Sequence, residues 1–129
     1  MCGINGFNWA DKSLIEVMNK KIEHRGKDDN GSFVEENISL GHQRLSVIDL
    51  SSAGHQPMQF ENLTLVYNGE IYNFKEIRSE LEKLEYKFDS NSDSEVLLKS
   101  YHAWGEDCLQ KFNGMFAFAI WDSKKNNLF

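Results

Sequence analysis

The stretch MFAFAIW, residues 115–121, is apolar at every position. Successive side chains of a strand point to opposite faces of a sheet, so a strand of this composition needs cover on both faces. The stretch is the longest unbroken apolar run in the chain, and it is far too short to cross a bilayer. It therefore predicts a central strand with helices over one face and a second sheet or helix layer over the other.

Strand-like and helix-like segments surround this stretch. Helices are predicted to begin at Ser13, Asn73 and Ser94. Ser13 with Glu16, and Asn73 with Glu76, have the spacing of a capping box, in which the two side chains bond reciprocally to the first turn. Further strands are predicted at residues 1–9, 32–35, 38–45, 63–67 and 86–89, and helix ends at Gly26 and Gly105. This order indicates an α+β fold with layered sheets and helices.

Bulk composition indicates one soluble domain. The chain has 129 residues, of which 40% are hydrophobic and 26% are charged. Its formal net charge of −6 argues against general nucleic-acid binding. Neither a membrane span nor a signal peptide is visible in the sequence, and two cysteines do not make a disulfide framework, so we expect a cytoplasmic protein.

Several familiar sites are excluded by their missing motifs. The chain has no phosphate-binding loop of the Walker type, no Cys-x-x-Cys and no His-Glu-x-x-His. Its four histidines share no metal-ligand spacing, so we expect no metal site. Cys108 is interpreted as a core thiol.

The stretch LVYNGEIYN, residues 65–73, admits two interpretations. Asn68-Gly69 is a strong signal for a hairpin turn. The same pair presents a side-chain amide beside a backbone N–H that no side chain obstructs, which are the two donors of an oxyanion hole.

Two charged residues also admit a structural and a functional interpretation. Arg44 lies in an apolar run and either reaches water or grips a ligand carboxylate through its planar fork. Asp93 either caps the third helix or faces a ligand ammonium, and Glu70 could share that second role. A free amino acid carries both charges, and a side chain that ends in an amide would make it glutamine.

Cys2 follows the initiator methionine directly. It is either a buried thiol or, once Met1 is removed, a nucleophile with a free α-amine on the same residue. An α-amine titrates close to neutral pH, so it can act as a general base without a histidine.

Five motifs occur in an order that resembles the class II glutamine amidotransferase domains, and in particular those of the glutamine-hydrolysing asparagine synthetases. The motifs are Cys2-Gly3-Ile4, His24-Arg25-Gly26, Arg44-Leu45-Ser46, Asn68-Gly69-Glu70-Ile71-Tyr72-Asn73 and Gly114-Met115-Phe116-Ala117-Phe118. The resemblance covers the whole chain and implies the αββα sandwich of the N-terminal-nucleophile hydrolases. Lys27 departs from it, because many relatives have proline after His-Arg-Gly.

The resemblance also implies roles for individual residues. Cys2 would be the nucleophile, and Asn68 and Gly69 would form the oxyanion hole. The substrate, glutamine, would be bound by Arg44, Leu45, Val47, Glu70 and Asp93. Glutamine would be hydrolysed to glutamate through a thioester, and the ammonia would pass to a second active site.

The family continues beyond the point where this chain stops, with further strands and an ATP-using synthetase domain. We therefore expect residues 1–129 to be a glutaminase domain that is incomplete at its C-terminal end. This domain would need no cofactor, whereas ATP and magnesium would serve only the missing synthetase domain. Asparagine synthesis from aspartate is the expected use of the ammonia.

Two alternatives stay open. One is a domain that serves another acceptor, such as an amino sugar, and the other is an inactive remnant that acts as an interaction module. Retained Met1 would favour the remnant, because it blocks the amine. The sequence also leaves a homodimer open.

Overall fold

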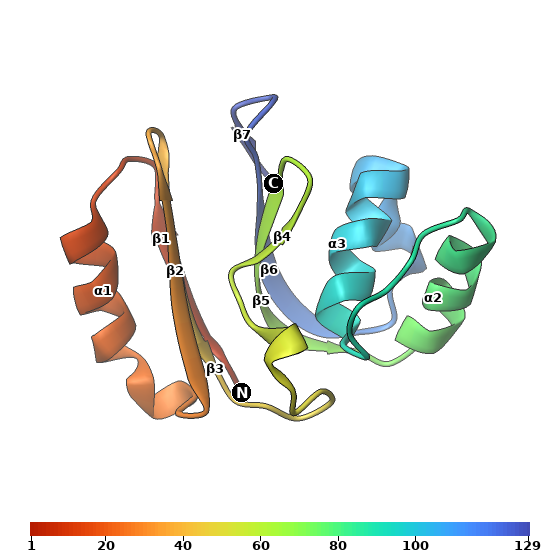
Figure 1. Ribbon diagram of the computed structural model, residues 1–129, viewed down its shortest axis with the longest axis horizontal. Helices are drawn as coiled ribbons and strands as arrows, with labels where there is room; N and C mark the ends of the chain where they lie inside the picture. Colours follow the sequence, from red (N-terminus) through yellow and green to blue (C-terminus); the bar gives the residue numbers. More distant parts are fainter.

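The computed structural model describes residues 1–129 as four layers, a helix, two sheets and a helix pair, which is the predicted αββα sandwich (Figure 1). Helix α1 (Lys12–Lys21) covers the first sheet, and helices α2 (Phe74–Lys83) and α3 (Asp93–Trp104) cover the second. None of these helices has both the length and the apolar character that a membrane span requires.

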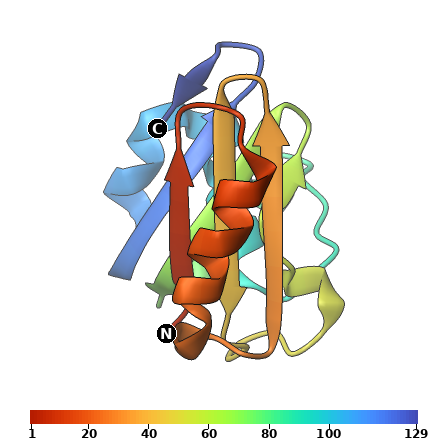
Figure 2. The ribbon, with the colours of Figure 1, turned by 90° about the vertical axis from the view of Figure 1, so that its left-hand side faces the viewer.

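The first sheet contains β1 (Gly3–Phe7), β2 (Asp29–Glu35) and β3 (Ile38–Arg44) in the antiparallel order β1-β3-β2. Every residue of the central strand β3 is buried, because α1 packs across one face of the sheet and the second sheet packs on the other (Figure 2). The predicted hairpin between β2 and β3 is confirmed.

The second sheet contains β4 (Met58–Phe60), β5 (Leu63–Ile71), β6 (Gly114–Asp122) and β7 (Asn127–Leu128), in sequence order. The apolar stretch of residues 115–121 is confirmed as part of the strand β6. It pairs with β5 along the full length of both strands, whereas β4 pairs only with the first residues of β5. The second half of β5 therefore has one edge without a neighbouring strand.

The main core lies between this sheet and its helices. The 3-10 segment η3 (Gly105–Lys111) follows α3 and contributes Cys108 to that core. The core consists of twelve buried residues: Leu63, Leu65, Tyr67, Ile71, Ile77, Leu81, Val96, Leu97, Leu98, Tyr101, Cys108 and Ile120. A smaller cluster between the two sheets contains Ile38, Leu40, Val66 and Trp121.

Two predicted helix caps are corrected by the structure. Asp11, not Ser13, is the N-cap of α1, and its side chain accepts from the Leu14 N–H at 2.8 Å. Asn73 is at the N-cap position of α2 but caps nothing, because its amide bonds instead to the backbone of Lys111 and Asn113.

Three further sequence predictions are wrong. Residues 86–89 form no strand, and α1 ends before Gly26, which follows the short 3-10 segment η1 (Glu23–Arg25). Asn68-Gly69 is not a turn, because both residues lie inside β5 and pair with Ala117 and Phe116 of β6. Strand pairing with β6 has overridden the local turn preference of Asn-Gly.

Candidate active site

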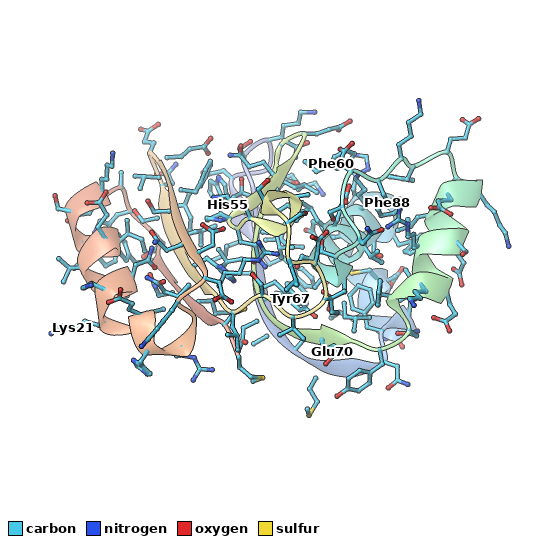
Figure 3. All side chains as sticks on the ribbon, turned by 60° about the horizontal axis from the view of Figure 1, so that its bottom comes forward. Lys21, His55, Phe60, Tyr67, Glu70 and Phe88 are labelled. Atoms are coloured by element: carbon cyan, nitrogen blue, oxygen red, sulfur yellow. The ribbon has the colours of Figure 1, made fainter.

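All eight residues predicted to act on glutamine line one cavity of about 180 Å³. They are Cys2, Arg44, Leu45, Val47, Asn68, Gly69, Glu70 and Asp93. The cavity is smaller than the 300–1,000 Å³ typical of sites for drug-sized ligands, so it suits a small metabolite. Figure 3 labels two of its lining residues, Tyr67 near the middle of the molecule and Glu70 below it.

Cys2 reaches the cavity because β1 pairs beside the end of β3. The register places Gly3 opposite Gln43, so the residue before β1 lies beside the residues that follow β3. The Cys2 Sγ lies 3.4 Å from the Leu45 nitrogen and 3.5 Å from the Leu45 carbonyl oxygen. Arg25 fixes the backbone here, since its Nε donates to the Cys2 carbonyl at 2.9 Å.

The open edge of β5 faces the cavity. The Tyr67 N–H donates to Gln56 Oε1 at 2.7 Å, and the Ile71 N–H donates to Asp93 Oδ2 at 3.0 Å. Both N–H groups therefore point away from β6. Backbone groups alternate with a period of two along a strand, so the N–H of Gly69, midway between these two residues, points to the same open edge.

Position 69 requires glycine, but not to leave the backbone N–H unobstructed as the sequence had suggested. A Cβ at this position would lie 2.4 Å from the Met115 carbonyl oxygen and 2.5 Å from the Phe116 Cα. Glycine thus permits close approach to β6 rather than keeping the way to the substrate clear. The neighbouring Asn68 has a side-chain Oδ1 that is buried without a partner, although buried polar atoms are rarely left unbonded.

Arg44 lies at the end of β3 and is only 7% exposed. Its Nη1 donates to the Ser51 carbonyl at 2.8 Å, and its Nη2 donates to the Asp49 carbonyl. These bonds hold the loop after β3 around the guanidinium, and three of the five N–H donors remain for a ligand. Arg44 makes no ion pair with any carboxylate.

Asp93 is the first residue of α3 and does not cap it, because the N-cap is Ser92. The Asp93 carboxylate is 5% exposed and accepts from the Tyr67 hydroxyl at 2.7 Å. No lysine, arginine or histidine pairs with it. A buried carboxylate without a cation is costly, so this group is suited to a cationic ligand.

The remaining predicted residues lie at the mouth of the cavity. Glu70 is exposed, and the apolar side chains of Leu45 and Val47 are 40% and 69% exposed. Met1 also lines the cavity, and the Cys2 nitrogen is joined to it in a peptide bond.

Three residues that were not predicted from the sequence hold the walls of the cavity together: Tyr67, Gln56 and Asp49. Asp49 Oδ2 accepts from the Asn91 N–H at 2.9 Å, which joins the loop after β3 to the loop before α3. Hydrogen bonds from Ser51 and Asn91 hold the pKa of the Asp49 carboxyl below its usual range. No local motif signals these contacts, because each joins segments far apart in the sequence.

The second cysteine is remote from this site. Cys108 is fully buried in the core, and its burial raises the pKa of the thiol to about 11. No group of three or more His, Cys, Asp or Glu side chains is placed to hold a metal ion.

Comparison with known proteins decides the family. A family model described as a glutamine amidotransferase domain matches residues 1–129. The chain belongs to this family. The five ordered motifs had predicted a class II glutamine amidotransferase domain similar to that of asparagine synthetases, and this prediction is confirmed.

The curated relatives of this amidotransferase domain are considerably longer than the chain. Asparagine synthetase [glutamine-hydrolyzing] 3 of Bacillus subtilis is 42% identical over 100% of this chain and 22% of its own length. Asparagine synthetase B of Escherichia coli is 39% identical over 98% of this chain and 24% of its own length. The chain thus spans less than a third of the relatives it matches.

Solved structures support the same fold at lower identity. The glutamine phosphoribosylpyrophosphate amidotransferase of Bacillus subtilis superposes with a TM-score of 0.77 over 95% of this chain and 35% of that one, at 20% identity. The amidotransferase domain described here therefore has the N-terminal-nucleophile hydrolase fold.

Proposed function

We propose that this domain hydrolyses glutamine to glutamate and ammonia. The observation that carries the proposal is a pair of buried, unpaired charges, Arg44 and Asp93, on the walls of one small cavity. An α-amino acid carries one carboxylate and one ammonium, so its two charges complement those of the cavity. The carboxylate of Glu70, at the mouth of the cavity, would add a second negative charge for the substrate ammonium.

The proposed chemistry begins at Cys2 after Met1 is removed. The freed α-amine takes the proton of the thiol, and the sulfur attacks the side-chain carbonyl carbon of glutamine. The C=O electron pair moves to oxygen, and the amide of Asn68 and the N–H of Gly69 stabilise the oxyanion. The C–N bond then breaks, and the protonated α-amine returns its proton to the leaving nitrogen, which departs as ammonia.

The second half of the reaction releases glutamate. Water gives a proton to the α-amine and attacks the γ-glutamyl thioester, and the C–S bond breaks to restore the thiol. The same residues therefore serve twice. No cofactor is needed in this scheme, because the residue that attacks also carries the base.

The use of the ammonia is a further part of the proposal. Its support is the similarity to asparagine synthetases, which points to asparagine synthesis from aspartate. On this view residues 1–129 are the glutaminase domain, incomplete at the C-terminal end, of a longer cytoplasmic protein. The synthetase domain of that protein would use ATP and magnesium. The proposal leaves a homodimer open.

The test is glutamine hydrolysis followed as glutamate formation in the protein and in a Cys2→Ala variant, with Cys108→Ala as the matched control. We expect activity in the protein and in the control, and none in Cys2→Ala. Equal activity in all three would contradict Cys2 as the nucleophile. Absence of hydrolysis from the protein and from a longer chain that carries it would overturn the proposed function.

A further inference from the structure

Tyr67 is held through all three of its polar groups and is only 2% exposed. Its N–H donates to Gln56 Oε1 at 2.7 Å, and its carbonyl oxygen lies 3.0 Å from His42 Nε2. Its hydroxyl donates to Asp93 Oδ2 at 2.7 Å. These three partners come from a loop, from the first sheet and from α3, so the position of Tyr67 is fixed from three directions.

The two carboxylate oxygens of Asp93 differ in their hydrogen bonds, because the Tyr67 hydroxyl donates to only one of them. Oδ2 accepts both from the Tyr67 hydroxyl and from the Ile71 N–H at 3.0 Å. Oδ1 accepts from no group of the protein, and it is not among the polar atoms that are both buried and unpartnered. Since Asp93 lines the cavity, Oδ1 is the oxygen that a ligand can reach.

The cation for this oxygen has to come from a ligand. Lys99 lies on the same helix, but its Nζ is bound to Glu95 Oε1 at 2.6 Å and to the Lys87 carbonyl. Arg44 lines the same cavity but forms no ion pair with Asp93.

We propose that Tyr67 determines the specificity of the site for an α-amino substrate by positioning Asp93. With Oδ2 held by the hydroxyl, the carboxylate cannot turn, and Oδ1 faces the α-ammonium. This inference rests on the proposed function and adds to it a residue that selects glutamine over an amide lacking the α-ammonium. Tyr67 is a positioning residue, because it acts on the substrate through Asp93.

The environment of the Tyr67 hydroxyl keeps it protonated, so it can always donate its hydrogen bond to Asp93. Burial, and after it the neighbouring Asp93 carboxylate, raises the pKa of Tyr67 above its usual range. The hydroxyl therefore stays protonated, and able to donate, at neutral pH. The ring itself packs in the main core, a task that phenylalanine would perform equally well. Tyr67→Phe thus separates the hydroxyl from the packing.

The experiment compares binding of glutamine and of glutaramate, which is glutamine without its α-ammonium. Calorimetric titration in a Cys2→Ala background avoids turnover. We expect Tyr67→Phe to weaken glutamine binding about tenfold, the scale of one hydrogen bond to a charged group, and to leave glutaramate binding unchanged. The control is Tyr101→Phe, a change in the same core at a tyrosine whose hydroxyl has no part in the cavity, and it should alter neither affinity.

A double-mutant cycle checks that Tyr67 acts through Asp93. Asp93→Asn should abolish the preference for glutamine, and adding Tyr67→Phe to it should cause no further loss. Additive losses of glutamine affinity in the double variant, or an unchanged preference for glutamine over glutaramate in Tyr67→Phe, would overturn the inference while the proposed function stands. A protein that retains Cys2 but binds neither compound and hydrolyses no glutamine would overturn both.

Discussion

The imidazole Nε2 of His42 lies 3.0 Å from the carbonyl oxygen of Tyr67, so a side chain of the first sheet is bonded to the backbone of the second. β3, which carries His42, also pairs with β1 and so places Cys2. β5, which carries Tyr67, continues directly into Asn68 and Gly69. The contact therefore joins the strands that bring the proposed nucleophile and the proposed oxyanion donors to one cavity.

The first prediction concerns this histidine and acid stability. Burial lowers the pKa of His42 to about 4 from an ordinary value of 6.5. Between these two values the unfolded chain binds more protons than the folded one, so stability is complete above pH 6.5 and is lost as the pH falls toward 4. We expect His42 to account for a loss of up to about 3 kcal/mol in the free energy of unfolding between pH 7 and pH 4.

Urea unfolding at several pH values measures this loss. A His42→Gln variant keeps a donor for the Tyr67 carbonyl but does not titrate, so its stability should fall less steeply than that of the protein over the same range. Parallel pH profiles for the two proteins would show that His42 is not responsible. Exposed His24→Gln is the control and should leave the profile unchanged.

The second prediction concerns processing and labelling of Cys2. We expect intact-mass measurement to show loss of one methionine residue, because a small residue follows Met1 and the proposed mechanism uses a free α-amine as its base. An electrophilic glutamine analogue should then label Cys2 and spare Cys108, which is buried with a raised thiol pKa. Peptide mapping identifies the labelled residue, and a label on Cys108 alone would mean that the nucleophile is misassigned.

The third prediction concerns Asn68. Removing one donor of an oxyanion hole typically lowers kcat by about 10²–10³-fold, so Asn68→Ala should lose activity on that scale while KM changes little. Steady-state kinetics of glutamine hydrolysis measures both constants. Asn8→Ala changes an exposed asparagine beyond the end of β1 and is expected to leave them unaltered. A rise in KM alone would assign Asn68 to substrate binding instead.

The fourth prediction concerns Gly54, which packs against the guanidinium of Arg44. A Cβ at this position would lie 2.1 Å from Nη2 of Arg44, so Gly54→Ala should displace the end of that side chain. We expect the KM for glutamine to rise about tenfold or more with kcat largely retained, since a hydrogen bond to the substrate carboxylate is disturbed.

Ser52→Ala is the control for this change, because it alters an exposed side chain of the same 3-10 turn. Its kinetic constants should match those of the unmodified protein. If Gly54→Ala behaves in the same way, Arg44 does not contact the substrate carboxylate.

The fifth prediction concerns the buried pair Lys99 and Glu95. Lys99 Nζ lies 4.9 Å from the ring centroid of Phe60 and 4.8 Å from that of Phe88, two residues that Figure 3 labels. Removing one partner of a buried ion pair leaves an uncompensated charge and costs about 3–5 kcal/mol. Lys99→Met should lower the free energy of unfolding by that amount, measured by denaturant titration.

Lys87→Met removes an exposed side chain from the residue whose carbonyl accepts from Lys99. It should leave the free energy of unfolding within about 0.5 kcal/mol of its original value. Equal effects of the two substitutions would contradict a specific role for the pair.

The layers of the fold could be predicted because their signals are local. The apolar stretch of β6 and the order of strand-like and helix-like segments together indicated a layered α+β fold, although Met115 and Ala117 near the start of β6 are exposed. The helix boundary at Asp11 was less predictable, since Asp11 and Ser13 are both good caps. A contact from β3 favours the first, because Ser39 Oγ accepts from the Asp11 N–H at 3.1 Å.

The placement of Cys2, Arg44 and Asn68 in one cavity could be predicted from the sequence, because their residue types suggested the proposed chemistry. The site was not predictable where a residue acts through partners that the fold brings to it. Tyr67 looked like an ordinary strand residue, and its role emerges only from contacts to Gln56, His42 and Asp93. Glycine is required at position 69 for a steric reason, the close approach of β6, which only the fold reveals.

The backbone N–H groups of β5 point alternately to its two edges, and this limits which insertions and deletions the strand can accept. Inserting or deleting a single residue between Tyr67 and Gly69 would exchange the two edges of the strand for every later position, and the N–H of Gly69 would then point at β6. Insertion or deletion of one codon in this segment should therefore abolish catalysis even where the side chains are preserved. In-frame insertions should be accepted at the exposed loop tips between the strands of either sheet.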